Sequence, residues 1–171
     1  TVGNYYTSEE DIVASLNGVY TSLTQSYVAD NYHYFTDVRA NATVVTNSGA
    51  NSGIPYQFYN YTLTEENVYV YNRYSQLYKI ISRANTLFAH LGDVSYATPS
   101  ARDTYEAEAR FLRALSYYWL VTEWGDVPLV LKVLESTEEV RANNYRRPKA
   151  EIYQAIFDDL KYVTESPLLD L

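Results

Sequence analysis

Apolar side chains recur three and four positions apart in four stretches of this sequence, the spacing that places them on one face of an α-helix. The four predicted helices cover about residues 9–28, 65–91, 99–124 and 148–165. We expect antiparallel packing of these helices and a small strand content. The pattern therefore predicts a mainly α-helical fold made of helical hairpins.

Polar caps and helix breakers mark the ends of the predicted helices. Ser8 and Thr64 are suitable N-cap residues, and each precedes acidic residues that favour the first turn of a helix. Pro99 and Pro148 fit the first turn of the third and fourth helices. Gly125 tolerates the left-handed conformation found at helix C-termini, so the third helix should end there.

We expect the third helix to be the central element of the fold. Its second half is apolar almost all round, which predicts that neighbours bury it on several sides. Phe111, Leu115 and Tyr118 should therefore belong to the core and not to a ligand site. The full predicted face comprises Ala107, Phe111, Ala114, Leu115, Tyr118 and Thr122.

Two arginines lie in the middle of this predicted helix, beside its apolar second half. Arg110 and Arg113 could bind an anion, but arginines in a buried helix more often pair with carboxylates or carbonyls of neighbouring elements. We favour this structural role for both side chains.

The helical spacing disappears in residues 30–62, where asparagine, glycine and tyrosine are frequent. A stretch of this length is usually a functional loop or a disordered segment, and its many aromatic rings argue against disorder. Flat rings stack on sugar faces, while amides and carboxylates bond hydroxyl groups. The alternative is that the rings pack this loop onto the second helix. The candidate ligand-binding residues are Tyr56, Phe58, Tyr59, Tyr61, Asn60, Asp37 and Asn41.

The amino-acid composition favours some classes of ligand and excludes some kinds of site. The chain has 20 tyrosines, an unusually high number beside 5 phenylalanines and 2 tryptophans. Tyrosine combines an apolar ring with a polar tip, which suits half-exposed binding surfaces. The net charge of −8 argues against binding to nucleic acid or to an anionic membrane surface. The sequence contains no cysteine and no methionine. The absence of cysteine excludes thiol catalysis, thiolate metal sites and disulfides within these residues.

No residue pattern indicates catalysis or a cofactor. Asp158 and Asp159 are adjacent on a helix and point in different directions, so they are poorly placed to flank a glycosidic bond. His33 and His90 are far apart in the sequence and have no metal-binding spacing. We therefore expect a binding protein with no enzymatic activity, metal or cofactor.

Five motifs in order along the chain carry a family resemblance. They are LNGVY at 16–20, YKIISRAN at 78–85, EARFLRALSYY at 108–118, WGDVPLV at 124–130 and IYQAIFDDL at 152–160. Together they resemble the N-terminal part of the SusD/RagB-like outer-membrane lipoproteins. The pairing of EARFLRALSYY with WGDVPLV is the most specific of these signals.

The resemblance implies a fold of irregular tetratricopeptide-like hairpins with long Tyr/Asn-rich loops, and residues 1–171 would be a single N-terminal helical part of a larger protein. It implies a cell-surface, lipid-anchored protein of the outer membrane, with the signal peptide and the lipidated cysteine upstream of Thr1. The expected partners are an oligosaccharide or polysaccharide ligand and a SusC-like TonB-dependent barrel transporter. The matched residues belong to the scaffold, so no ligand contact follows from the motifs.

Three hypotheses follow. The first is a nutrient-binding protein that captures a glycan, or in some relatives a peptide, for its transporter. The second is a helical-repeat scaffold that binds only protein, with the Tyr-rich loop serving as packing. The third is a glycosidase, which the carboxylate pattern disfavours.

Overall fold

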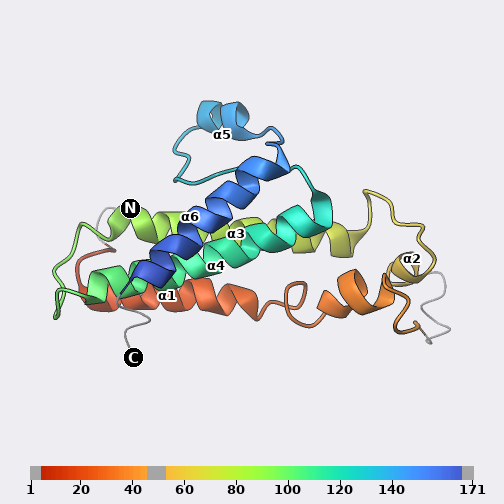
Figure 1. The fold of residues 1–171 in the computed structure, drawn as a ribbon, viewed down its shortest axis with the longest axis horizontal. Helices are drawn as coiled ribbons and strands as arrows, with labels where there is room; N and C mark the ends of the chain where they lie inside the picture. The colour runs from red at the N-terminus through yellow and green to blue at the C-terminus, as the bar shows by residue number, and fades with distance from the viewer. Residues whose placement is uncertain (1–4, 46–52, 167–171) are drawn as a thin grey trace. The chain divides into compact units, whose positions relative to one another are not determined.

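The computed structural model describes residues 5–45 and 53–166, which form an almost entirely helical structure (Figure 1). Within these residues the only β-type pairing is one antiparallel bridge between Val127 and Arg147. The mainly α-helical prediction is therefore confirmed. The helices are α1 (Glu9–Leu23), the π-helix η2 (Tyr34–Val38), α2 (Tyr56–Tyr59), α3 (Val68–His90), α4 (Ala101–Trp124), α5 (Thr137–Asn143) and α6 (Lys149–Glu165).

The first helix is shorter than predicted. It was expected to continue to about residue 28, but α1 ends at Leu23 and turns follow it. The reason is a long-range contact, because Arg73 Nη1 donates to the carbonyl oxygens of Tyr27 at 3.1 Å and Val28 at 3.2 Å. These carbonyls point to a side chain from α3 and do not continue the helix.

The start of α3 also differs from the prediction. Asn67, and not Thr64, caps this helix: its side-chain oxygen accepts from the backbone N–H groups of Tyr69 at 3.0 Å and Val70 at 3.3 Å. The third predicted helix begins at Ala101, two residues later than expected. Its predicted end is confirmed, since Gly125 has φ 73° and follows the last helical residue, Trp124.

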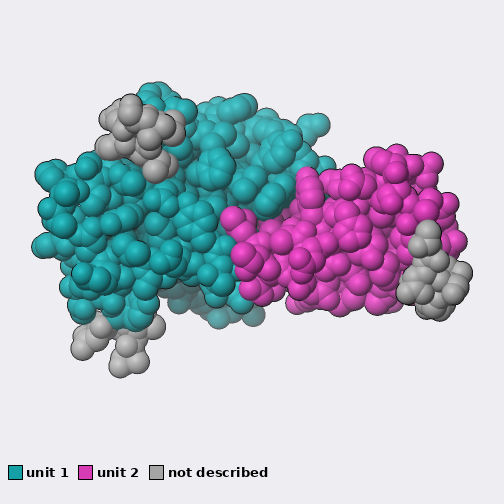
Figure 2. Space-filling model, turned by 90° about the horizontal axis from the view of Figure 1, so that it is seen from below, with its two compact units in different colours: residues 1–22, 78–171 teal, residues 23–77 magenta. Residues whose placement is uncertain are grey.

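The chain folds into two compact units (Figure 2). Unit 1 comprises residues 1–22 and 78–171, and unit 2 comprises residues 23–77. The helix α3 contributes residues to both units. That residues 1–171 form a single helical part of a larger protein stays a prediction.

In unit 1, α6 runs antiparallel to α4 and packs against it (Figure 1). Arg113 donates to both carboxylate oxygens of Asp159, at 2.8 and 2.7 Å, and Arg110 donates to the same group at 2.8 Å. Arg113 also donates to the side-chain oxygen of Asn85 on α3 at 2.7 Å. The predicted structural role of both arginines is confirmed.

The predicted apolar face of α4 is partly wrong. Ala107 and Ala114 are buried as expected, but Phe111 is 45% exposed and Tyr118 is 49% exposed. The helix is turned so that Arg113 faces its partners on α3 and α6. Leu115 is half-buried and Thr122 is exposed as a result. The residues of α4 that are buried are Glu106, Ala107, Ala109, Leu112, Arg113, Ala114, Ser116, Tyr117, Leu120 and Val121.

Candidate ligand-binding site

The seven candidate residues lie in unit 2, in a segment that is more ordered than predicted. Residues 30–62 were expected to form a loop, but they contain the short helices η2 and α2. Asn47, Gly49 and Asn51, which contributed to that expectation, lie outside the described residues. The candidate side chains are therefore held by two helical turns and the residues that follow them.

Phe58 lies inside the core of unit 2, fully buried. Its ring is 4.9 Å from the ring of Phe35 and 5.6 Å from that of Tyr34, measured between centroids. Tyr69 of α3 lies 6.3 Å away on another side. Phe58 therefore packs the segment onto α3, as the alternative to ligand binding predicts, and its ring is not available to a ligand in this conformation.

Two buried polar residues that the sequence analysis did not single out position this core. Asn67 donates from its amide to the carbonyl of Ile54 at 3.1 Å and to the side chain of Gln57 at 2.8 Å, which ties the start of α2 to the cap of α3. Arg73 is fully buried, and its guanidinium lies 4.9 Å from the ring centroids of both Tyr32 and Phe35. The Asn cap was recognisable from the sequence, whereas nothing marked Arg73 as a core residue.

The remaining aromatic candidates lie nearer the surface. Tyr56 and Tyr59 are half-buried on α2, with ring centroids 5.6 Å apart and planes tilted by 37°. Asn60 is exposed, and Tyr61 is 67% exposed. These consecutive residues offer ring surface beside an amide, which is the combination that a sugar requires.

The two parts of the candidate set meet through one hydrogen bond. The hydroxyl of Tyr61 donates to the backbone carbonyl of Arg39 at 2.8 Å, so Tyr61, two residues after the end of α2, is held against the end of η2. Asp37 and Asn41, both exposed, flank that carbonyl in the sequence. Asn41 and Tyr61 each have φ 57°, a conformation that few residues other than glycine adopt.

The rings around Phe58 form an aromatic support beneath this surface. Burial raises the pKa of the Tyr69 phenol, and the nearby hydroxyls of Tyr34 and Tyr27 raise it further. The arrangement therefore offers stacking from exposed rings and hydrogen bonds from Asp37, Asn41 and Asn60. It can bind a neutral polyhydroxylated ligand without charge neutralisation.

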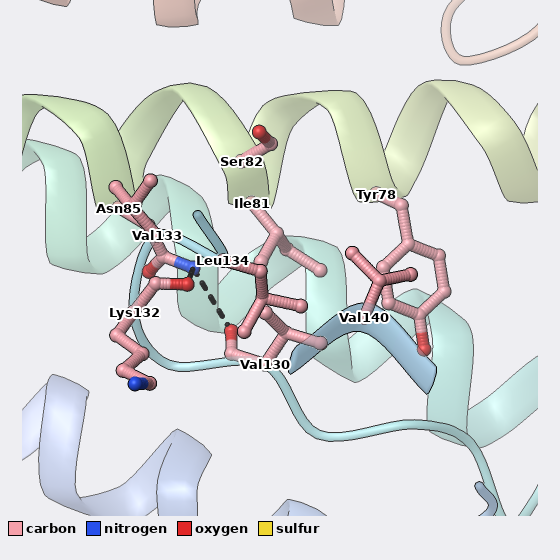
Figure 3. Close-up of a pocket in the computed structure, with 9 residues that line it drawn as sticks. All are labelled: Tyr78, Ile81, Ser82, Asn85, Val130, Lys132, Val133, Leu134 and Val140. Carbon is pink, nitrogen blue, oxygen red and sulfur yellow. Dashed lines mark hydrogen bonds between the residues drawn. The ribbon is translucent and has the colours of Figure 1, made fainter. Parts of the chain in front are cut away.

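A separate cavity in unit 1 has different chemistry (Figure 3). It measures about 310 Å³, and Ile81, Val130 and Leu134 point into it in Figure 3. The side-chain amide of Asn85 also lines the cavity, but both of its ends have partners: its NH2 group donates to the carbonyl of Val130 at 3.0 Å, and its oxygen accepts from Arg113 at 2.7 Å. This mainly aliphatic lining is less suited to a sugar than the rings of Tyr56, Tyr59 and Tyr61 in unit 2, which we call the tyrosine surface.

The two adjacent aspartates of α6 have different surroundings. Asp159 is buried in its ion pairs, and Asp158 accepts a hydrogen bond from Gln154 at 2.8 Å. In the part of the chain that the structure describes, no three His, Asp or Glu side chains gather as a metal site. None of the helices described is both long and apolar enough to cross a membrane.

Comparison with known proteins gives one family match over nearly the whole chain. Residues 4–166 match the SusD-like family described as "Starch-binding associating with outer membrane". SusD-like protein P2 of Formosa agariphila is 28% identical over 163 residues, which cover 95% of this chain and 32% of the relative. The chain thus spans about a third of the length of this curated relative.

Solved structures share the fold. A laminarin-binding SusD-like protein is 28% identical with a TM-score of 0.76, and the match covers 92% of this chain and 34% of that protein. A SusD-like protein from Bacteroides fragilis is 21% identical with a TM-score of 0.77, covering 95% of this chain and 30% of that one. The second likeness concerns the fold alone.

Proposed function

Because this chain belongs to the SusD-like family, described as starch-binding and associating with the outer membrane, we propose that it is the N-terminal part of a cell-surface protein that captures oligosaccharides. The observation that carries this proposal is the tyrosine surface of unit 2, where Tyr59 and Tyr61 lie beside Asn60. The laminarin-binding relative supports a glycan as the ligand class.

The proposed capture works by stacking and hydrogen bonding. The exposed ring of Tyr61 and the paired rings of Tyr56 and Tyr59 would contact sugar faces, and the exposed amides and carboxylate would bond ring hydroxyls. The Tyr61–Arg39 hydrogen bond fixes one ring before the ligand arrives, which reduces the conformational entropy lost on binding. Phe58 supports these rings from within the core.

Affinity electrophoresis against laminarin, starch and xyloglucan tests this function. We expect Tyr61→Ala to weaken retardation by about fivefold, since losing one stacked ring costs on the order of 1 kcal/mol. Tyr145→Ala is the matched control, because Tyr145 is 48% exposed and lies in unit 1. Unchanged retardation in Tyr61→Ala and Tyr59→Ala would remove the tyrosine surface as the site.

A second candidate is capture of a peptide at the same surface. The burial of Phe58 also fits the hypothesis that the aromatic residues serve as packing in a helical scaffold that binds only protein. Absence of retardation by every glycan, with peptide binding that is sensitive to Tyr61→Ala, would select the peptide candidate.

We further propose that the whole protein is lipid-anchored at the cell surface and delivers its ligand to a SusC-like TonB-dependent transporter. The family's association with the outer membrane supports this location. A signal peptide ending in a lipidated cysteine upstream of Thr1 is the expected sequence observation. Copurification of a TonB-dependent barrel with the membrane-anchored protein tests the partner.

A further inference from the structure

Positive charge is concentrated in one short stretch of unit 1. Residues 141–149, with the sequence RANNYRRPK, contain four of the 13 lysines and arginines of the chain and no acidic residue. This concentration contrasts with the net charge of −8 for the whole chain. The stretch leads from the last turn of α5 to the first residue of α6 (Figure 1). We call residues 141–149 the basic segment.

Three of the four cations in the basic segment are exposed. Arg141, Arg146 and Lys149 lie at the surface, and within the described residues their charged groups have no hydrogen-bond or ion-pair partner. The arginines of α4 differ, since Arg110 and Arg113 both bond a carboxylate of α6. Guanidinium and ammonium groups that no carboxylate neutralises are available to bond an external anion.

The fourth cation and the backbone hold the basic segment in place. Arg147 donates from its guanidinium to Glu151 at 3.2 Å and from its backbone N–H to the carbonyl of Val127 at 2.9 Å. The carboxylate of Asp126 accepts from the backbone N–H of Lys149 at 2.9 Å. The segment is thus fixed at two points to its surroundings, which lowers the entropy lost when its exposed side chains bind a ligand.

An aromatic ring and an amide accompany the cations. Tyr145 is 48% exposed, and the guanidinium of Arg147 lies 4.6 Å from its ring centroid and so supports the ring. Asn144 beside it is exposed. A ring that can stack and an amide that can bond hydroxyls are the groups that contact sugars, and the cations add an affinity for anionic substituents.

Local charge, and not the net charge, decides whether a glycan chain can bind here. Charges farther away than about 8 Å are largely screened at physiological ionic strength. A glycan chain contacts a narrow strip of protein, so it meets mainly the cations of the basic segment. An extended anionic lipid surface faces more of the molecule, whose remaining residues are strongly acidic. These observations favour a glycan over a lipid headgroup.

We propose that the basic segment is a second glycan site, selective for sugars that carry a carboxylate or a sulfate ester. The proposal rests on the proposed function, in which the protein captures glycans. Arg146 and Lys149 bond the anionic substituent, and Tyr145 contacts the sugar face. A neutral glycan meets only one ring and one amide here, so Tyr145→Ala stays a control for neutral ligands of the tyrosine surface.

Isothermal titration calorimetry on the whole protein tests this site with three probes. Dextran sulfate and neutral dextran share one backbone and differ in the sulfate esters, and alginate supplies carboxylates. The test variant combines Arg146→Gln with Lys149→Gln. The matched control combines Lys79→Gln with Lys161→Gln, because both lysines are exposed in unit 1 and their loss changes the net charge equally.

We expect dextran sulfate, alginate or both to bind, and the test variant to raise Kd by about tenfold. The control should change Kd by less than about twofold, and neither variant should change the response to dextran. Binding of one anionic probe alone supports the proposal and identifies the substituent. Added sodium chloride should weaken the binding, since the contacts are exposed.

Three results overturn the proposal. The first is that neither anionic glycan binds, and the second is an equal loss in the test variant and the control, which would assign the effect to net charge. The third is binding to phosphatidylglycerol vesicles, lost in the test variant, without binding to either glycan. Neutral glycans and Tyr61→Ala test the tyrosine surface separately, so each of the two proposals can fail without the other.

Discussion

Replacement of Asp159 by alanine is the sharpest test of how unit 1 is held together. The side chain of Asp159 is 3% exposed and accepts three hydrogen bonds from two arginines, at 2.7 to 2.8 Å. Its removal leaves the guanidinium of Arg113 buried without its carboxylate. Breaking a buried ion pair in this way costs about 3–5 kcal/mol.

The structure places the expected loss near the lower end of that range. Arg113 keeps hydrogen bonds to Asn85 and to the carbonyl of Leu131, and its guanidinium lies 4.6 Å from the Phe88 ring centroid. Arg110 is 25% exposed and keeps its bond to Glu106. We therefore expect Asp159→Ala to lower the free energy of unfolding by about 3 kcal/mol, equivalent to a fall in Tm of roughly 6–12 °C.

Urea unfolding followed by circular dichroism measures this change. Asp158→Ala is the matched control on the same helix, because Asp158 is exposed and bonds only Gln154 among the interactions described. We expect this control to stay within about 0.5 kcal/mol of the parent. A loss below about 1 kcal/mol for Asp159→Ala would refute the reasoning, since it would mean that Arg113 does not depend on this carboxylate.

Three further predictions concern single positions. Burial raises the pKa of Tyr20 to about 12, helped by its hydrogen bond to Glu108 at 2.7 Å. The stabilisation from this hydrogen bond is thus complete below the pKa of tyrosine in the unfolded chain, near 10, and is lost as the pH rises through 12. Tyr20→Phe should therefore remove one late step from the ultraviolet absorbance titration of the tyrosines. Gly125→Ala should lower the free energy of unfolding by on the order of 1–2 kcal/mol because its φ of 73° strains any L-residue, whereas Gly92→Ala should change it little. Arg73→Met should cost about 3 kcal/mol in urea unfolding, because two carbonyls and two rings lose their buried cation.

Local signals in the sequence predicted the helices well. The end of α4 required only Gly125, which has the positive φ of 73° expected there although its ψ of −119° is not that of the left-handed helix region, and α6 followed directly from Pro148 and its apolar spacing. The end of α1 was not predictable in this way. It depends on Arg73, which is distant in the sequence from the carbonyls that it bonds.

The candidate site shows the same limit. The many aromatic residues in the polar segment 30–62 indicated a ring-rich surface, and Tyr61 is indeed 67% exposed. The sequence could not distinguish it from Phe58, which is fully buried, because both are aromatic residues in one polar segment. The difference arises from Phe35 and Tyr69, which surround Phe58 and come from η2 and α3.

The orientation of α4 follows from its polar residues more than from its apolar ones. Apolar side chains of similar size replace one another in a core at little cost, so an apolar pattern that extends almost all round a helix does not decide which side faces inward. A buried guanidinium requires acceptors in specific directions, and Arg113 finds them on both α3 and α6. Once Arg113 faces those helices, Phe111 and Tyr118 must turn away from them. The acceptors that Arg113 requires on α3 and α6 therefore decide which side of α4 faces inward, which the apolar pattern alone does not decide.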